Sequence, residues 1–178
     1  MRHYVTQRPS DTSITAHCCT SGCLRTSDKM QSFHNAKPFD LWQSVPSALR
    51  TVLPNVSWSR ERLHALTLPT VELALDDLRW QLDLPWWRNG PAERHFSVAP
   101  NQVRADPERF AKHWQRTIDS DLRFPIHLLQ RDRLTILDGV HRLLKADMQA
   151  MRTIPVHIVG LGLFVDGVVD LETTSTSS

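Results

Sequence analysis

The chain has 178 residues, of which 40% are hydrophobic and 22% charged, a composition typical of one globular domain. Its net charge is +2, and the four basic and two acidic side chains of residues 1–35 account for it, so the remainder is neutral. A nucleic-acid-binding protein usually has a basic face, so the neutral remainder argues against that class of partner. No run approaches the roughly 18 apolar residues of a membrane span, and no secretory signal is visible. We therefore expect a cytoplasmic protein with no membrane partner.

Residues 1–35 are rich in Ser, Thr and Cys and have little periodic apolar content, so we expect a disordered tail. Four potential zinc ligands lie close together in this tail: His17, Cys18, Cys19 and Cys23. Structural zinc sites usually take pairs of ligands from separate turns, which favours an unstructured segment over a metal site here. Met30 is an alternative translation start, and residues 173–178 are expected to be disordered as well.

The intervening residues 36–172 are expected to form a single domain in which helical and strand patterns alternate. Four elements are predicted in its first half: a helix over 40–53, a helix over 59–66, a strand over 70–75 and a helix over 76–82. Pro46 opposes the first of these helices, because it falls near the first turns. Two prolines and a glycine predict a loop over 85–91.

The helix expected to begin near Asp106 has the clearest start, because Asp106 suits the N-cap and Pro107 the first helical position. Apolar side chains then recur at every fourth position and predict one core-facing stripe: Phe110, Trp114, Ile118 and Leu122. The remaining predicted elements are strands over 125–129 and 134–137, a helix over 140–151 and a strand over 154–159. Pro155 favours an edge position for the last strand. Together these elements predict an α+β domain.

The string Asp138-Gly139-Val140-His141-Arg142 joins a predicted strand to a predicted helix. Gly139 allows a tight turn and close approach of a ligand to the backbone. The free N–H groups and the positive dipole at the start of the helix favour an anion there. His141 and Arg142 add side-chain donors, and Asp138 can hold Mg²⁺ or accept a proton from a hydroxyl group. The alternative is that Asp138 only caps the helix and that Arg142 is solvated.

Residues 134–146 and 153–159 resemble the ParB/sulfiredoxin superfamily, whose members share a strand, a Gly-x-His-Arg box, an apolar helix and a closing Ile-Pro-Val strand. The resemblance covers roughly 35 residues, is not traceable over residues 36–105, and implies a ParB/sulfiredoxin-like mixed sheet with flanking helices. Sulfiredoxins have a cysteine where this chain has Val140, so their thiol chemistry is not expected. ParB proteins continue into a helix-turn-helix domain, for which we expect no room after Val159.

The Asp-Gly-x-His-Arg box is most similar to that of the free-serine kinases of this superfamily, which phosphorylate a small hydroxyl compound. The resemblance implies that ATP or another nucleoside triphosphate is bound together with Mg²⁺. The residues implied for nucleotide binding are Gly139, Val140, His141, Arg142 and Lys145. Asp138 and His141 would be catalytic, and Asp138 would also bind the metal ion. His127 and His157, on the strands that flank this string, are further candidates.

Acidic side chains and tryptophans are concentrated ahead of this string. The candidates for substrate binding are Glu72, Asp76, Asp77, Trp86 and Trp87. Carboxylates pair with ammonium groups and indole faces stack on sugar rings, so we expect a small polar or cationic substrate. The alternative is a solvated acidic face beside tryptophans that pack in the core. The chain also resembles garosamine-type aminoglycoside resistance proteins, which implies an aminoglycoside antibiotic as the acceptor.

These observations predict a kinase that transfers a phosphoryl group from a nucleotide to a hydroxyl of a small polar molecule, with antibiotic resistance as its implied role. Two other classes of function stay open. One is a nucleotide-binding regulatory module without catalysis. The other is a ParB-like nuclease or DNA-associated protein, which the neutral charge of residues 36–178 opposes.

Overall fold

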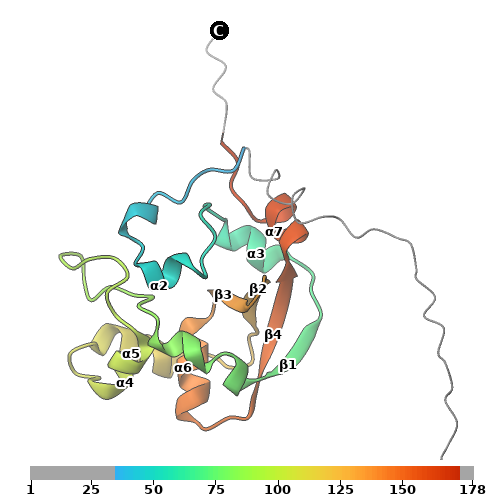
Figure 1. Ribbon diagram of the computed structural model, residues 1–178. Helices are drawn as coiled ribbons and strands as arrows, with labels where there is room; N and C mark the ends of the chain where they lie inside the picture. The colour runs from blue at the N-terminus through green and yellow to red at the C-terminus, as the bar shows by residue number, and fades with distance from the viewer. Residues whose placement is uncertain (1–34, 173–178) are drawn as a thin grey trace, which may run out of the picture.

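The computed structural model describes residues 35–172 of the protein. Its centre is a four-stranded sheet of β1 (Thr70–Ala74), β2 (Ile126–Gln130), β3 (Leu134–Asp138) and β4 (Thr153–Gly160). The strand order is β1-β4-β2-β3, with β2 parallel to β4 and the other two pairs antiparallel (Figure 1). A mixed sheet with flanking helices confirms the predicted α+β class. The predictions for the two tails and the cysteine cluster lie outside the described residues.

Helices connect β1 to β2 and β3 to β4, a short turn joins β2 to β3, and the helices cover both faces of the sheet (Figure 1). The α-helices are α2 (Ser47–Arg50), α3 (Arg60–Ala65), α4 (Pro100–Ala105), α5 (Ala111–Asp119), α6 (Val140–Met148) and α7 (Leu161–Gly167). The 3-10 helices are η2 (Trp42–Ser44), η3 (Leu75–Asp77) and η4 (Arg79–Asp83). Among residues 35–172, no helix combines the length and the apolar composition needed to cross a membrane.

Strand β2 separates two apolar layers, because successive side chains of a strand point to opposite faces. Ile126 and Leu128 pack on one face against α4, α6, η3 and η4. Leu129 packs on the other face against Leu63 of α3 and Phe164 of α7. His127 shares the face of Leu129, so its imidazole lies beneath α3. This alternation explains how a histidine becomes buried at the edge of the functional region.

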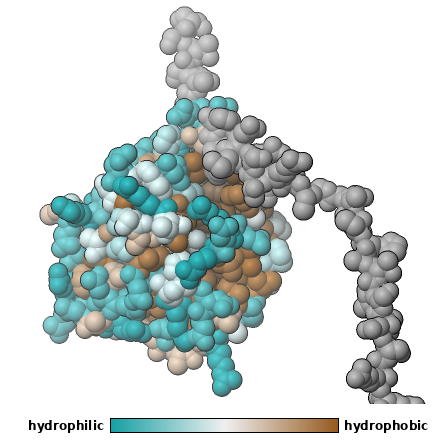
Figure 2. All heavy atoms as spheres, viewed as in Figure 1, coloured by the Kyte–Doolittle hydropathy of each residue, from teal (hydrophilic) through white to brown (hydrophobic). Residues whose placement is uncertain are grey.

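A third apolar cluster lies beside the sheet around α2, where Leu49 and Val45 are buried. Trp80, Trp86 and Phe96 pack against this cluster. Hydrophilic side chains cover much of the face seen in Figure 2, with smaller apolar areas between them. The loop over 85–91 is confirmed as non-helical. It is attached to the domain because Trp86 packs against this third cluster and Trp87 against the main core.

The two predicted helices of the first half that the structure does not confirm are interrupted at specific points. The helix expected over 40–53 is wrong as one element, because Pro46 takes the N-cap position of α2 with an extended ψ of 154° and separates it from η2. The α-helix expected over 76–82 is replaced by η3 and η4. The predicted helix over 59–66 and strand over 70–75 are confirmed as α3 and β1.

The helix expected from Asp106 begins later, at Ala111, and α4 before it was not predicted. Its expected apolar stripe is also partly wrong, because Ile118 is 41% exposed while His113 and Thr117 are buried. A spacing of four residues advances about 40° around a helix at each step, so the stripe leaves the buried face after two steps. His113 therefore lies on the buried face of α5.

The strand containing Pro155 is not at the edge, as its proline suggested, but lies between β1 and β2. Pro155 pairs with Glu72 of β1, whereas the parallel pairing with β2 begins only at Val156. The proline thus precedes the stretch that is bonded on both sides, which is why a central strand accepts it. The other three predicted elements of the second half are confirmed as β2, β3 and α6, and α7 was not predicted.

Candidate functional site

A cavity of about 610 Å³ opens where β3 meets the N-terminus of α6. Asp138, Gly139, Val140, His141 and Arg142 all line it, so the predicted anion-binding string does face a space large enough for a ligand. Two further arginines, Arg60 and Arg116, line the same cavity. Five aromatic side chains complete the lining: Phe39, Trp58, Trp86, Trp87 and Phe96. The cavity therefore combines cationic and aromatic surfaces.

The turn between β3 and α6 depends on Gly139 for two reasons. Its φ angle is +112°, a left-handed conformation that side chains with a Cβ rarely adopt. A Cβ atom at this position would also lie 2.9 Å from Nη2 of Arg142 and 3.0 Å from Cγ1 of Ile126. The missing side chain thus leaves the space in which the Arg142 guanidinium packs against the backbone.

Asp138 is surrounded by cationic groups. Its Oδ2 accepts a hydrogen bond from Nη2 of Arg142 at 2.9 Å and lies 3.3 Å from Nε2 of His64, while Arg60 Nε is 3.9 Å from Oδ1. Burial raises the pKa of this carboxyl, but the charge and hydrogen bond of Arg142, together with Arg60 and His64, outweigh burial and lower it. Asp138 is therefore ionised at neutral pH and holds the Arg142 guanidinium near the N-terminus of α6.

Trp87 forms a stack with two histidines from different helices. Its ring is 4.2 Å from that of His141, with an interplanar angle of 13°, and 4.7 Å from that of His113, with an angle of 8°. Burial lowers the pKa of His113, and burial followed by the charges of His113 and Arg116 lowers that of His141 to about 4. Both imidazoles are therefore neutral at pH 7.

The hydrogen bonds of this stack fix the tautomer of His141. His113 Nε2 lies 2.9 Å from the carbonyl oxygen of Arg88, which only accepts, so this nitrogen carries the proton. Nδ1 of neutral His113 then has a lone pair and accepts from Nε2–H of His141 at 3.4 Å. The remaining nitrogen of neutral His141, Nδ1, is consequently a proton acceptor, which suits the catalytic role expected of this side chain better than the expected role as a phosphate donor.

A second group of histidines extends from Asp138 toward β4. His64 of α3 stacks on His127 with ring centroids 5.0 Å apart. Nε2 of His127 lies 3.3 Å from Nδ1 of His157, and Nε2 of His157 lies 2.9 Å from Oγ1 of Thr70. Burial, then the neighbouring His64 and His157, lowers the pKa of His127 to about 4. His127 and His157, the two further candidates from the sequence, thus belong to one series of side-chain contacts that reaches Asp138 through His64.

Lys145 does not belong to the cavity lining. Its ammonium group donates to the carbonyl oxygens of Ile118 and Ser120, each at 2.6 Å. These carbonyls lie at the C-terminal end of α5, where a cation offsets the negative end of the helix dipole. Lys145 thus ties α6 to α5.

The predicted substrate-binding residues fall into two separate places. Trp86 and Trp87 line the cavity, and Trp86 is anchored by a 2.7 Å hydrogen bond from Nε1 to the carbonyl oxygen of Gln81. Glu72, Asp76 and Asp77 do not line it: Glu72 lies exposed on β1, and Asp76 pairs with Arg79. The acids and tryptophans that the sequence suggested as one ligand surface are thus not brought together.

Sequence reasoning missed several residues of this site, among them Arg60, His64, His113 and Arg116. Their local signals were ordinary, since arginine and histidine on short helices are usually solvated. His113 offered a weak signal, because it stands among the apolar positions of α5. No protein-family model, no curated protein and no solved structure matches this chain.

Proposed function

We propose that the protein binds a nucleoside triphosphate in the cavity at the β3–α6 turn and transfers its terminal phosphoryl group to a hydroxyl of a small molecule. The observation that supports this most is the lining of the cavity, which includes Arg60, Arg116 and Arg142 together with the N-terminus of a nine-residue helix. Arginine binds phosphate through paired N–H groups, and a helix N-terminus adds free backbone donors. This proposal includes membership of the ParB/sulfiredoxin-like fold.

The aromatic lining supports the same ligand class. Phe39, Trp58 and Phe96 lie in the same cavity as the three arginines, and Phe39 contacts both other rings at centroid distances of 6.0 and 6.2 Å. Planar bases stack on such rings, as purines and pyrimidines do in many nucleic-acid sites. In the proposed complex, the base contacts this aromatic group while the phosphates reach the arginines.

The proton of the acceptor hydroxyl goes to Nδ1 of His141 in the proposed reaction. As the acceptor oxygen bonds to the γ-phosphorus, the bond from that phosphorus to the β–γ bridging oxygen breaks, and the nucleoside diphosphate leaves. Charge on the phosphoryl oxygens is stabilised by Arg142 and Arg116. Asp138 keeps Arg142 in position through their 2.9 Å hydrogen bond.

Mg²⁺ held by Asp138 does not fit the observed surroundings of this carboxylate. Mg²⁺ prefers an octahedron of oxygen ligands, whereas Asp138 is contacted by two guanidinium groups and an imidazole. Any Mg²⁺ that accompanies the nucleotide phosphates would supply charge neutralisation there. The steps proposed above depend only on residues of the chain.

The acceptor is proposed to be a small hydroxyl compound, and the cavity does not favour a polycation. Among residues 35–172, Asp138 is the only carboxylate that lines it, and that charge is already paired with Arg142. An aminoglycoside therefore has no carboxylate cluster to bind within this cavity. Hydroxy amino acids and neutral sugars fit the lining better than a polycationic aminosugar does.

Calorimetric titration of the full chain with ATP, GTP, CTP and UTP in the presence of Mg²⁺ tests the binding step. We expect at least one nucleotide to bind, and Arg116→Ala to weaken it about 10- to 100-fold, the usual cost of one charge-assisted contact. Arg116 is exposed, so its removal does not disturb the core. Arg152→Ala removes an exposed arginine that does not line the cavity, and should leave affinity unchanged.

Release of nucleoside diphosphate with a panel of hydroxy amino acids, sugars and aminosugars tests the transfer step. Turnover with any one of these acceptors supports the kinase. Nucleotide binding without turnover on the whole panel would favour the regulatory module instead. If none of the four nucleotides binds, the proposed function is wrong.

A further inference from the structure

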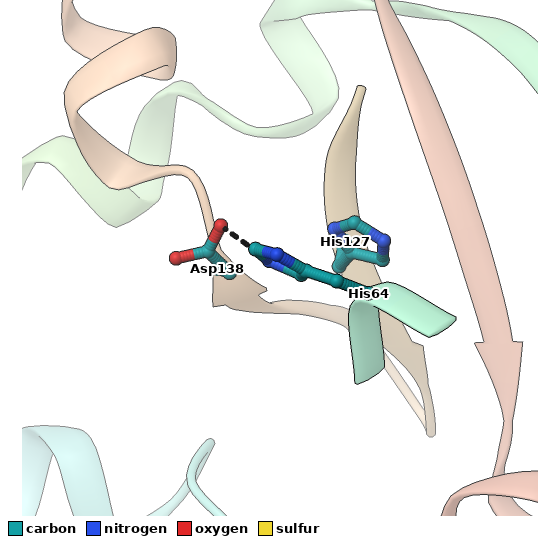
Figure 3. A group of neighbouring side chains, drawn as sticks. All are labelled: His64, His127 and Asp138. Atoms are coloured by element: carbon teal, nitrogen blue, oxygen red, sulfur yellow. Dashed lines mark hydrogen bonds and ion pairs between the residues drawn. The ribbon is translucent and has the colours of Figure 1, made fainter. Parts of the chain in front are cut away.

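Three potential metal ligands meet beside the cavity, each from a different element. His64 comes from α3, His127 from β2 and Asp138 from the end of β3, and Figure 3 shows their side chains facing a common space. One ligand atom from each lies within 4.8 Å of the other two. Among residues 35–172, this is the one such group of three histidine, cysteine or carboxylate side chains.

His127 supplies the strongest indication that something binds between these side chains. It is only 7% exposed, and its Nδ1 atom is buried without a hydrogen-bond partner among the described residues. Its other nitrogen, Nε2, is occupied by His157, so Nδ1 is the atom that remains for a ligand. A buried polar atom without a partner is rare, because the free energy lost when water is removed from it is not offset by a hydrogen bond in the protein.

The surroundings of His127 are those of a metal-bound imidazole. Histidines that bind metals usually donate their second N–H to a fixed partner, which sets the tautomer and the ring orientation. Here Nε2–H of His127 can donate to Nδ1 of His157, and Nε2–H of His157 can donate to Oγ1 of Thr70. When the hydrogen bonds run in this direction, Nδ1 of His127 keeps a lone pair. Figure 3 shows a ring nitrogen of His127 on the side of Asp138.

We infer that His64, His127 and Asp138 bind a divalent transition-metal ion of the zinc type. Two imidazoles and one carboxylate suit Zn²⁺ and its first-row neighbours, whereas Mg²⁺ and Ca²⁺ prefer oxygen ligands. Three protein ligands also leave a coordination position open, as in catalytic rather than structural zinc sites. The inference does not depend on the proposed kinase activity, although both involve Asp138, because it rests on His64 and His127, which take no part in the proposed reaction.

Binding requires a rotation of His64, because its ring stacks on that of His127 with centroids 5.0 Å apart and an interplanar angle of 21°, and two rings stacked in this way do not both point at one ion. Ligand atoms of a tetrahedral zinc ion lie about 3.3 Å apart, given bonds of roughly 2.0 Å. His64 Nε2 and Asp138 Oδ2 are already 3.3 Å apart. His64 is the ligand that can adjust, since 48% of its side chain is exposed and α3 has only six residues.

The two arginines beside Asp138 are the unfavourable element for a cation. Arg142 donates to Oδ2 at 2.9 Å, and Arg60 lies 3.9 Å from Oδ1. Carboxylates that bind metals are commonly hydrogen-bonded in addition, so the Arg142 contact is compatible with metal binding through the carboxylate. Arg60 is largely exposed, with 72% of its side chain accessible, and can turn away into solvent.

Titration of the full chain with Zn²⁺ in the absence of nucleotide tests this inference. Cys18, Cys19 and Cys23 are replaced by Ser in the background, so that the cysteine cluster does not contribute. We expect one ion per chain, and a His64→Ala variant in which affinity falls at least about 10-fold, since even partners of ligands commonly contribute that much. His95→Ala removes a histidine outside the group and should bind Zn²⁺ normally.

Co²⁺ provides a spectroscopic check on the ligands. In the same Ser-substituted chain, its visible d–d bands should indicate a low-coordinate site and should disappear in Asp138→Asn. Unchanged Zn²⁺ affinity in both His64→Ala and Asp138→Asn would overturn the inference. So would loss of all binding in the Ser-substituted chain, because the cysteines would then be the ligands. Since nucleotide is absent, neither result bears on the kinase proposal.

Discussion

The indole of Trp87 lies parallel to the imidazole of His141, with ring centroids 4.2 Å apart. The same indole covers His113, so one side chain from a loop fixes two histidines on α5 and α6. This relationship changes the role expected of Trp87. Trp87 was expected only to contact the substrate that receives the phosphoryl group. It also holds His141, the proposed proton acceptor, in place.

Trp87→Ala is therefore expected to lower both stability and turnover. Removal of a large aromatic side chain with two stacked neighbours should reduce the free energy of unfolding by about 3 kcal/mol. Trp87→Phe keeps an aromatic face and should retain most of the stability and kcat. Urea unfolding and steady-state kinetics of both variants provide the measurement. A rise in the acceptor KM alone, with kcat and stability unchanged, would show that Trp87 acts only on the substrate.

Gly139→Ala is expected to weaken nucleotide binding as well as the fold. The φ of +112° strains any residue with a Cβ, at a cost of about 1–3 kcal/mol, and the methyl group would displace the Arg142 guanidinium. Thermal unfolding and nucleotide titration should therefore change together. Gly90→Ala is the matched control, since its φ is +93° but a Cβ there meets no atom within 4 Å. It should lose stability without losing nucleotide affinity.

The roles of His141 and Asp138 in the proposed reaction are separated by two substitutions. We expect His141→Gln to lower kcat at least about 100-fold, the usual scale for losing a general base, while the nucleotide Kd changes modestly. Asp138→Asn should lower kcat less, because it weakens the pairing with Arg142 but leaves the proposed proton acceptor in place. If Asp138→Asn shows the larger fall, the carboxylate accepts the proton, and His141 only supports the cavity wall.

The lowered pKa of His141 predicts how stability depends on pH. In the folded protein its pKa is about 4, lowered by burial first, then by His113, Arg116 and Arg142 and partly restored by Asp138, whereas its ordinary value is 6.5. The unfolded chain thus takes up a proton at higher pH than the folded protein does. The stability that comes from keeping His141 neutral in the folded protein is fully present above pH 6.5 and is lost as the pH falls toward 4.

Melting temperatures measured between pH 8 and pH 4 check this expectation. The wild-type chain should lose stability across that range, and His141→Gln should show a flatter curve. Some slope should persist in the variant, because burial also lowers the pKa of His113. His95→Gln serves as the control and should follow the wild-type curve. Identical curves for the wild-type chain and His141→Gln would contradict the assignment of a buried neutral imidazole.

Local patterns in the sequence were sufficient for the turn at the centre of the site. A strand, the pair Asp138-Gly139 and an apolar helix follow one another directly, and each is encoded within a few residues. The β2–β3 hairpin and the helix α3 were predictable for the same reason. Side-chain period and glycine conformation act over short distances, so they leave a readable signal.

The partners around that turn were decided only by the tertiary structure. His64 reaches Asp138 across 74 residues of chain, and His113 meets His141 across 28. These contacts follow from the strand order, which sets β2 beside both β3 and β4, and from the packing of α3 and α5 on opposite faces. Periodicity indicates that a side chain is buried but not which side chain it meets, because many packings satisfy the same pattern. The pairing of histidines with Trp87 and Asp138 is therefore a property of the folded chain.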